Sequence, residues 1–465
     1  MNQAASHATA GGAPETGVTA RIVREARAVR WNALPDATRE AARQCLLDWL
    51  GCSVAGAEDE LVDILVEEFG HEGPGAPNSG VSLIGRRLRM GPLHAALING
   101  AASHALDYDD VNLAMLGHPS VAILPGLLAL AESRNADGPA TMAAFVAGYE
   151  AACRVGKLVG SAHYDHGFHT TATVGSIGAA VACAHLMGLD EIAFAHAVGI
   201  AATQAAGLKS MFGTMCKPLH AGKAAQNGLL AARLASRGFT SRNDALECAQ
   251  GFAATLSTTL DVDAALAVPP RGHYIVDTLF KYHAACYLTH GAIECALGAR
   301  KAGRLAAANI ASVVVRANLQ NDKVCNIAVP RSGLEAKFSL RQTVAMALAG
   351  LDTASPAAYS DGMAGDEVLA ALRDKVRVEL VEGLAITAAD LTLTSNDGAV
   401  LRRSHDAGVP AGNLVEQRLR LLSKFNSLVT PVYGGKKTQE LATLASNVDQ
   451  LTDITTLLRA AALRE

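Results

Sequence analysis

Residues 213–228 read Gly213-Thr-Met-Cys-Lys217-Pro-Leu-His220-Ala-Gly-Lys-Ala-Ala-Gln-Asn-Gly228. The small residues after His220 favour a helix that neighbouring helices can approach closely. Lys217 precedes a proline that suits the first turn of such a helix, so its ammonium group would lie at a turn and can face a pocket. A solvated surface lysine is the alternative for this segment taken alone. The stretch therefore predicts packed helices and marks Lys217 and His220 as candidate site residues.

The same composition, rich in small and aliphatic residues, extends on both sides of this segment. Half of the 465 residues are hydrophobic and only 4% are aromatic, so alanine, leucine and valine supply most of the apolar surface. Between residues 20 and 268, long runs of these residues are separated by turn signals such as Asn135-Ala-Asp-Gly138, which predicts one large helical domain. A chain of this length exceeds the size at which one hydrophobic core stops growing, so we expect a second domain.

The second domain is predicted to be α+β and to cover residues 269–408, after a Pro/Gly cluster at 268–272. An Asn396-Asp-Gly398 sequence between two apolar runs predicts a hairpin with a type I′ turn. The expected strands are 310–319, 376–381 and 391–401, and the expected helices are 286–305 and 340–351.

The chain then returns to helical patterns, at 414–425 and 438–463. We expect residues 409–465 to pack back on the first domain, which makes that domain discontinuous. The predicted fold class is therefore mainly α, with a large all-α domain and a smaller inserted α+β domain. Residues 1–19 are rich in alanine, glycine and serine and are predicted to be a disordered tail.

Charge and cysteine content restrict the classes of partner. The net charge is −4 and no run of five or six like charges occurs, so neither nucleic acid nor a membrane surface is an expected partner. Nine cysteines lie mostly in apolar stretches without zinc-type spacing, which indicates reduced core thiols. We find neither a signal peptide nor an apolar span long enough for a transmembrane helix, and we expect a cytoplasmic protein.

Polar residues gather in four further segments. Residues 104–120 contain three carboxylates and two histidines beside Gly and Pro. These side chains either bind a ligand or cap helices. A magnesium site would also need a second acid-rich segment, which the sequence lacks. Residues 163–173 combine three histidines with hydroxyls at a helix start, which suits a carboxylate better than zinc. Residues 281–291 follow the domain boundary, where ligand sites are common. Residues 335–342 begin a helix and carry two cations, which either face the site or are simply solvated.

Together these segments resemble the MmgE/PrpD family, whose members include 2-methylcitrate dehydratase, cis-aconitate decarboxylase and iminodisuccinate epimerase. The matching strings are Leu46 to Cys52, the segment with Asp107 and His118, Gly167 to Glu247, Glu335 to Ser339, and the region ending near Phe425. The resemblance implies a helical domain with an inserted α+β lid, a homodimer, and catalysis without a metal or organic cofactor. It places the substrate pocket between the helical domain and the lid.

The resemblance also assigns site residues. The catalytic positions it implies are Asp107, His118, His169, Lys217 and His290. We further expect substrate binding by His220, Lys337, Arg341 and Gln342. Preorganised positive groups can stabilise an enolate beside a carboxylate, and a histidine can move the proton. We expect His169 or His290 to transfer that proton and Asp107 to orient or accept.

The predicted function is that of a cofactor-independent lyase that dehydrates a small hydroxy polycarboxylate such as citrate or 2-methylcitrate. Epimerisation of a dicarboxylate such as iminodisuccinate and decarboxylation of a cis-aconitate-like acid are the alternatives. Val111 stands where decarboxylase-type members have threonine, and Gln342 where many have tyrosine, so the substrate stays open. Lys217-Pro-Leu-His220 also replaces the Trp-Lys-Gly form of the methylcitrate dehydratases. A third class is a non-catalytic ligand-binding relative that kept the scaffold.

Overall fold

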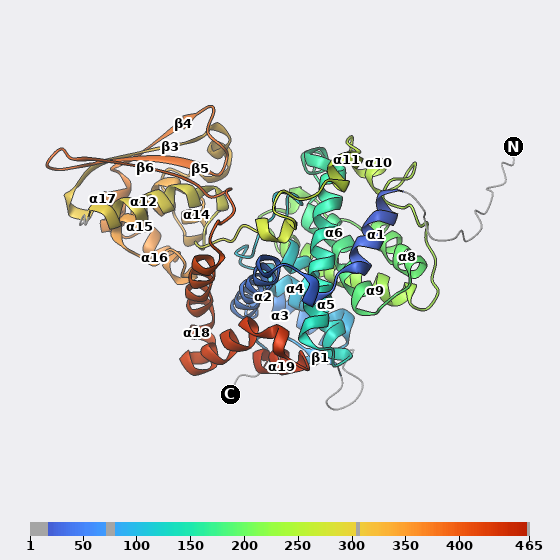
Figure 1. Ribbon diagram of the computed structural model, residues 1–465. Helices are drawn as coiled ribbons and strands as arrows, with labels where there is room; N and C mark the ends of the chain where they lie inside the picture. The colour runs from blue at the N-terminus through green and yellow to red at the C-terminus, as the bar shows by residue number, and fades with distance from the viewer. Residues whose placement is uncertain (1–16, 71–79, 304–306, 463–465) are drawn as a thin grey trace. The chain divides into compact units, whose positions relative to one another are not determined.

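The computed structural model describes residues 17–70, 80–303 and 307–462. It is mainly helical with one small mixed sheet, as predicted (Figure 1). Two compact units divide the chain: unit 1 comprises residues 1–278 and 429–465, and unit 2 comprises residues 279–428. Within the described residues, no helix is both long enough and apolar enough to cross a membrane.

The unit boundaries lie further along the chain than the expected 268 and 408. The segment before 278 is tied to α6 (Gly138–Asp165), because Glu150 accepts the backbone N–H groups of Tyr274 and Ile275 at 3.0 Å each. The first part of α18 (Leu414–Ser446) belongs to unit 2, where Arg420 pairs with Glu294. The predicted tail of 1–19 lies outside the described residues up to residue 16, and α1 begins at Val18.

Unit 1 is a bundle of helices with one short two-stranded hairpin. The hairpin strands are β1 (Val81–Ser82) and β2 (Arg89–Met90). Its helices, besides α6 and the end of α18, are α1 (Val18–Ala28), α2 (Asp36–Gly56), α3 (Glu60–Gly70), α4 (Pro92–His104), α5 (Pro119–Ser133), α7 (Thr170–Leu186), α8 (Glu191–Ala202), α9 (Cys216–Ala235), α10 (Phe252–Leu256), α11 (Val262–Leu266) and α19 (Thr455–Ala462).

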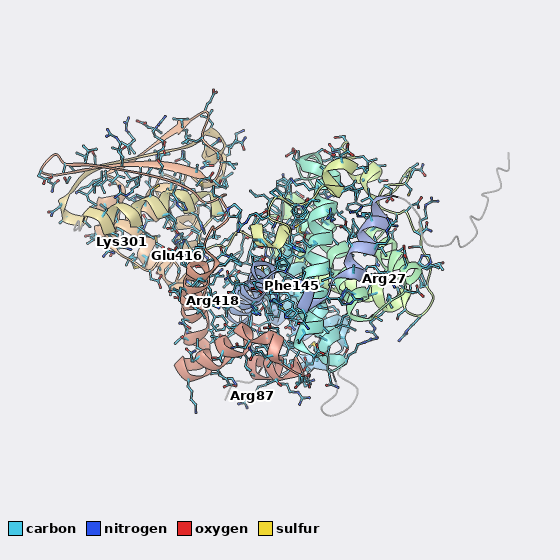
Figure 2. The ribbon with its side chains drawn as sticks, viewed as in Figure 1. Arg27, Arg87, Phe145, Lys301, Glu416 and Arg418 are labelled. Carbon is cyan, nitrogen blue, oxygen red and sulfur yellow. The ribbon has the colours of Figure 1, made fainter. Side chains whose placement is uncertain are left out.

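Helix α7 forms the centre of this bundle, between α5, α6, α8 and α9. Every residue from Thr170 to Ala184 is buried, as expected for a helix surrounded by others. Glycines allow the closest approaches: a Cβ on Gly100 of α4 would lie 2.6 Å from the Cα of Gly222 on α9. Phe145 of α6, labelled in Figure 2, adds one of the larger fully buried side chains.

Unit 2 contains a four-stranded sheet in the order β4-β3-β5-β6. Strand β3 pairs in parallel with β4 and antiparallel with β5, and β5 pairs antiparallel with β6. Helices α12, α15 and α17 lie on one face of the sheet (Figure 1). The elements are β3 (Ile310–Asn318), β4 (Val376–Val381), β5 (Ala388–Ser395), β6 (Val400–Asp406), α12 (His290–Gly303), α13 (Asp322–Cys325), α14 (Gly333–Ala336), α15 (Leu340–Ala349), α16 (Asp361–Ala364) and α17 (Glu367–Arg373).

Three local predictions need correction. The hairpin between β5 and β6 is present, but only Gly398 has a positive φ, 84°, whereas a type I′ turn needs positive φ at both central residues. The helix expected from 286 begins at His290, after a 3₁₀ turn, and its expected end at 305 lies outside the described residues. The helix expected at 438–463 is interrupted between α18 and α19, where the backbone bonds to the start of α6: Gly138 N–H donates to the Leu451 carbonyl at 2.8 Å.

Candidate active site

The site begins at the turn after α4, where Asp107 takes a left-handed backbone conformation with φ 48°. Such a conformation is uncommon outside glycine, and it is found preferentially at functional turns. The Asp107 carboxylate is 47% exposed and lies 2.7 Å from the ammonium group of Lys217. Lys217 stands in the first turn of α9, as its position before Pro218 predicts. The pair therefore presents a carboxylate and a cation side by side at two helix ends.

His118 lies beside this pair, at the start of α5. Its Nε2 is 3.7 Å from Asp107 Oδ1, and its backbone N–H donates to Thr171 Oγ1 at 3.1 Å. The preceding Gly117 is needed for this approach, because a Cβ there would lie 2.7 Å from Thr170 Oγ1. The start of α7 thus fixes the position of His118.

A second carboxylate, Asp109, lies between two imidazoles. Its Oδ1 is 2.8 Å from His104 Nδ1, and its Oδ2 is 2.8 Å from His118 Nδ1. Burial favours the protonated form of Asp109, but the two imidazoles outweigh it and hold the pKa of this carboxyl well below its usual range. Burial lowers the pKa of His104 to about 4, although the neighbouring Asp109 carboxylate raises it. The buried Nε2 of His104 has no hydrogen-bond partner among the described residues.

His169 and His220 form a second imidazole pair. Their Nδ1 atoms are 3.0 Å apart, so one ring donates and the other accepts. His169 lies at the start of α7, with its ring centroid 6.1 Å from that of His104 and 5.0 Å from that of Phe212. Burial and the neighbouring cationic groups lower the pKa of His169 far below its ordinary value, and burial lowers that of His220. Both rings are therefore neutral near pH 7.

The nine predicted site residues fall into two groups. Asp107, His118, His169, Lys217 and His220 form the cluster of unit 1 described above. His290, Lys337, Arg341 and Gln342 belong to unit 2.

The unit 2 residues have their own surroundings. His290 is buried against His283 and Tyr287, with ring centroids 4.9 and 5.1 Å away, and burial and His283 lower its pKa well below the ordinary value. Gln342 is fully buried; its amide donates to the Met363 carbonyl at 3.3 Å and accepts from Arg373 at 3.4 Å. Arg341 donates to Asn326 at 2.7 Å, and Lys337 is half-buried.

Sequence reasoning did not assign His104, Asp109 or Phe212 to the site. His104 and Asp109 belong to the 104–120 segment, and their positions on either side of Asp107 in the sequence could have indicated that they join the site. Nothing in the sequence distinguishes Asp109, hydrogen-bonded to His104 and paired with His118, from Asp110, which accepts the Ser120 hydroxyl at 2.5 Å. That difference arises from which way each side chain points after the turn.

The same cluster could supply metal ligands. One ligand atom from each of His104, Asp107, Asp109 and His118 lies within 4.8 Å of the others. The donor types suit a divalent transition metal. However, the Lys217 ammonium group already pairs with Asp107, and both oxygens of Asp109 face imidazole nitrogens. A cation would have to compete with these three groups, so the arrangement fits an organic anion better than a metal.

Comparison with known proteins gives full-length matches. Sequence models of the MmgE/PrpD N-terminal and C-terminal domains match residues 20–265 and 283–450. The chain is 27% identical to a cis-aconitate decarboxylase of Aspergillus terreus, over 96% of each chain. It is also 27% identical to the human cis-aconitate decarboxylase, over 92% of this chain and 91% of the relative. The mouse enzyme of the same name is 26% identical over 92% and 90%.

Proposed function

We propose, from the premise that this chain belongs to the MmgE/PrpD family of enzymes, that it is a lyase which removes a carboxyl group from a small polycarboxylate of the cis-aconitate type. The observation that carries the proposal is the Lys217 ammonium group, held 2.7 Å from Asp107 beside His118. The full-length similarity to cis-aconitate decarboxylases supports loss of CO₂ over the other reactions of polycarboxylates. Decarboxylation thereby replaces the dehydration expected from the sequence as the leading reaction.

Substrate binding would use the cationic side of the cluster. Lys217 is a compact charge that attracts a carboxylate, and Asp107 is exposed enough for a substrate carboxylate to approach the same ammonium group. His169 and His220, both neutral, can donate or accept a hydrogen bond without adding charge. The Phe212 ring, 5.0 Å from that of His169, adds an apolar wall. A small acid with two or three carboxylates suits this mixture of one charge and several neutral donors.

Loss of CO₂ leaves an electron pair on the carbon that carried the carboxylate. In an acid of the cis-aconitate type the adjacent C=C bond shifts and passes that pair to the carboxylate at its far end as a dienolate, and Lys217 would stabilise the developing negative charge. A proton must then be added to the carbon skeleton. We assign it to His118, which lies beside Asp107 and Lys217 and faces Asp109 at 2.8 Å. Burial lowers the pKa of His169 and His290, the residues expected from the sequence, too far for either to hold that proton near pH 7. Each turnover would release one CO₂ and consume one proton, which His118 regains from solvent.

Dehydration of a hydroxy polycarboxylate is the second candidate. Val111, four residues after Asp107, is half-buried and offers no hydroxyl at the position where decarboxylase-type members have threonine. In this reaction the same cluster would remove a proton next to a carboxylate and return it to the leaving hydroxide, which departs as water. Lys217 would again stabilise the enolate.

The experiment is incubation of the purified chain with cis-aconitate, citrate, 2-methylcitrate and iminodisuccinate in D₂O, followed by NMR. Decarboxylation is expected to release CO₂ from cis-aconitate and to add one deuteron to the product. Water loss from citrate or 2-methylcitrate would identify a dehydratase instead. Exchange of an α-proton of iminodisuccinate would identify an epimerase. Absence of turnover with all four acids, while they still bind, would indicate the non-catalytic ligand-binding relative. Activity that is lost on chelation and restored by added metal would overturn the assignment of the cluster to an organic anion alone.

A further inference from the structure

His104, the last residue of α4, belongs to the unit 1 cluster, but the proposed reaction does not use its side chain. That side chain is completely buried. Its ring packs against those of His118 and His169, whose centroids lie 4.6 and 6.1 Å away. Any contribution of His104 to the reaction must therefore act through a neighbouring side chain.

The neighbour that His104 holds is Asp109, whose Oδ1 lies 2.8 Å from His104 Nδ1. The other oxygen, Oδ2, faces His118 Nδ1 at 2.8 Å but has no hydrogen-bond partner among the described residues. A carboxylate rotates readily about the bond that joins it to its side chain. The hydrogen bond at Oδ1 therefore sets the plane of the Asp109 carboxylate, and this plane places Oδ2 in front of His118.

The charge states of the two groups determine which ring nitrogen of His104 carries the proton. Burial lowers the pKa of His104 to about 4, so its ring is neutral near pH 7 and holds one proton. Burial favours the protonated form of Asp109, but the two imidazoles hold the pKa of this carboxyl well below its usual range, so it is ionised and can only accept. The proton of His104 must then lie on Nδ1. Its Nε2 is a bare nitrogen, in agreement with its burial without a partner in the described part of the chain.

We propose that His104 is a positioning residue of this enzyme, whose Nδ1–H group holds the Asp109 carboxylate in the plane that presents Oδ2 to His118. The inference rests on the proposed function, in which His118 delivers the proton. Because the buried ring touches neither the substrate nor the carbon that is protonated, loss of its hydrogen bond should lower kcat and leave KM nearly unchanged.

The first test replaces the His104 ring in two ways. His104→Asn keeps an N–H donor in place of Nδ1, because in both side chains this nitrogen is bonded to Cγ. His104→Leu has a similar volume and no donor. We expect His104→Leu to lower kcat about tenfold to 100-fold, the effect of one hydrogen bond to a charged group, and His104→Asn to regain most of that loss.

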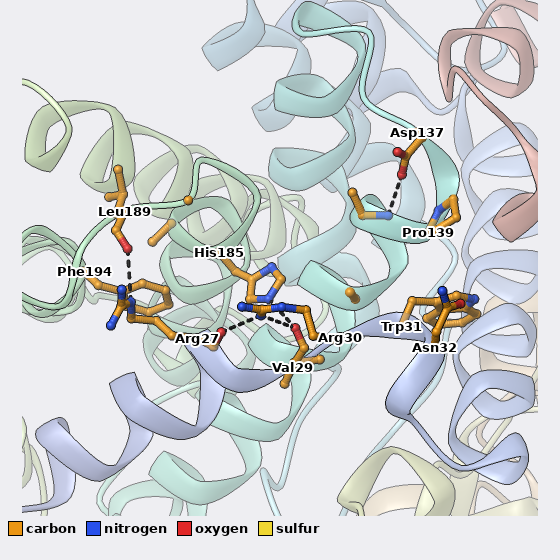
Figure 3. Close-up of a pocket in the computed structure, with 14 residues that line it drawn as sticks. Arg27, Val29, Arg30, Trp31, Asn32, Asp137, Pro139, His185, Leu189 and Phe194 are labelled. Carbon is orange, nitrogen blue, oxygen red and sulfur yellow. Dashed lines mark hydrogen bonds between the residues drawn. The ribbon is translucent and has the colours of Figure 1, made fainter.

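His185 provides the matched control. It lies in the last turn of α7, at the opposite end of this helix from His169, and lines a separate cavity of about 500 Å³ (Figure 3). Its Nε2 lies 3.1 Å from the Val29 carbonyl, and its buried Nδ1 has no hydrogen-bond partner within the residues described. It therefore resembles His104 in its bonding and differs in its location. His185→Leu and His185→Asn should keep the kcat of the unaltered protein.

Urea unfolding of all four variants shows whether a change in rate follows from a change in stability. If His104 only supports the fold, the folded fractions of His104→Leu and His104→Asn should have the same kcat. That result would overturn the proposal, as would a loss of activity that lies in KM alone.

The second test needs no turnover. Imidazole NMR of protein labelled with ¹⁵N-histidine reports which ring nitrogen carries the proton, and the His104 signals are those missing from His104→Asn. The proposal expects a neutral ring with its proton on Nδ1 near pH 7. A proton on Nε2 would overturn it, because Nδ1 could then not donate to Asp109. If none of the four acids turns over, the proposed function fails, whereas this measurement still decides how Asp109 is held.

Discussion

Asp109 is the residue on which the geometry of the candidate site depends. It is completely buried, yet it is held in its ionised form by His104 and His118, one on each carboxylate oxygen. A buried charge of this kind is tolerated only when it is paired. The hydrogen bond with Asp109 fixes the orientation of the His104 ring, whose Nε2 has no hydrogen-bond partner in the part of the chain that the structure describes.

Removing the cation of the site should remove most of the catalysis. We expect Lys217→Ala to lower kcat/KM by about 10²-fold or more, because one preorganised electrostatic group commonly contributes that much. Lys223→Ala, on the same helix α9 and exposed, is the matched control and should keep its rate. Steady-state kinetics with the substrate identified by NMR measures both. A rate for Lys217→Ala close to that of the control would exclude Lys217 from the mechanism.

Neutralising Asp109 should lower the rate of catalysis. In Asp109→Asn the two imidazoles lose the carboxylate that faces them, at 2.8 Å from each. We expect kcat/KM to fall by at least about 10²-fold, as for carboxylates that orient a catalytic histidine, with kcat affected more than KM. Asp110→Asn, which removes the carboxylate bonded to Ser120 instead, should keep its rate. Equal rates for the two variants would reduce Asp109 to a structural role.

At the scale of elements, the starts and ends of four helices build the site. α4 ends at His104, α5 begins after His118, α7 after His169, and α9 carries Lys217 in its first turn. These ends converge because α4, α5, α7 and α9 pack closely through small residues. The precision of the cluster therefore depends on backbone distances between helices.

A methyl group between α4 and α9 should disturb this packing. In Gly222→Ala the new Cβ would collide with the Leu97 carbonyl, so we expect a net destabilisation on the order of 1–3 kcal/mol despite the better helix propensity of alanine. Gly435→Ala is the control in α18, where a Cβ meets nothing within 4 Å. Urea unfolding followed by circular dichroism compares the two. Equal stabilities for both variants would mean that the interface adjusts without cost.

At the scale of the whole molecule, unit 1 carries a fully buried acid, Asp110, and a half-buried one, Glu150, outside the site. Burial raises the pKa of Asp110 to about 8 and that of Glu150 to about 7. Both carboxyls are therefore protonated in the folded chain at pH values where the unfolded chain has already ionised them. The homodimer expected from the family resemblance stays a prediction at this scale, and sedimentation equilibrium would test it.

These acids should make stability fall as pH rises. Between the unfolded values near 4 and the folded values, the folded state binds more protons, so each group should lower the free energy of unfolding by up to about 1.4 kcal/mol per pH unit. The loss should level off above pH 8, once Asp110 ionises in the folded chain. Urea unfolding across this range should give a smaller slope for Asp110→Asn than for the exposed control Asp263→Asn. Equal slopes for the two variants would show that Asp110 is ionised throughout.

The sequence by itself determined the fold class and the family, and it predicted the segments that supply the unit 1 cluster of the candidate site. Helix periodicity, turn residues and strand alternation are local properties, so they identify most elements without knowledge of their neighbours. Lys217 before Pro218, and the histidines at helix starts, are local in the same way. The predicted bounds are wrong where contacts with other elements determine the backbone, as at the break before α19, where the backbone bonds to the start of α6.

Only the tertiary structure decided which side chains meet. Asp107 with Lys217, and His169 with His220, are separated by many residues in the chain and come together through helix packing. The choice of Asp109 rather than Asp110 as the partner of two histidines depends on the backbone direction after the left-handed turn at Asp107. Such contacts depend on three-dimensional distances, which spacing along the chain does not encode.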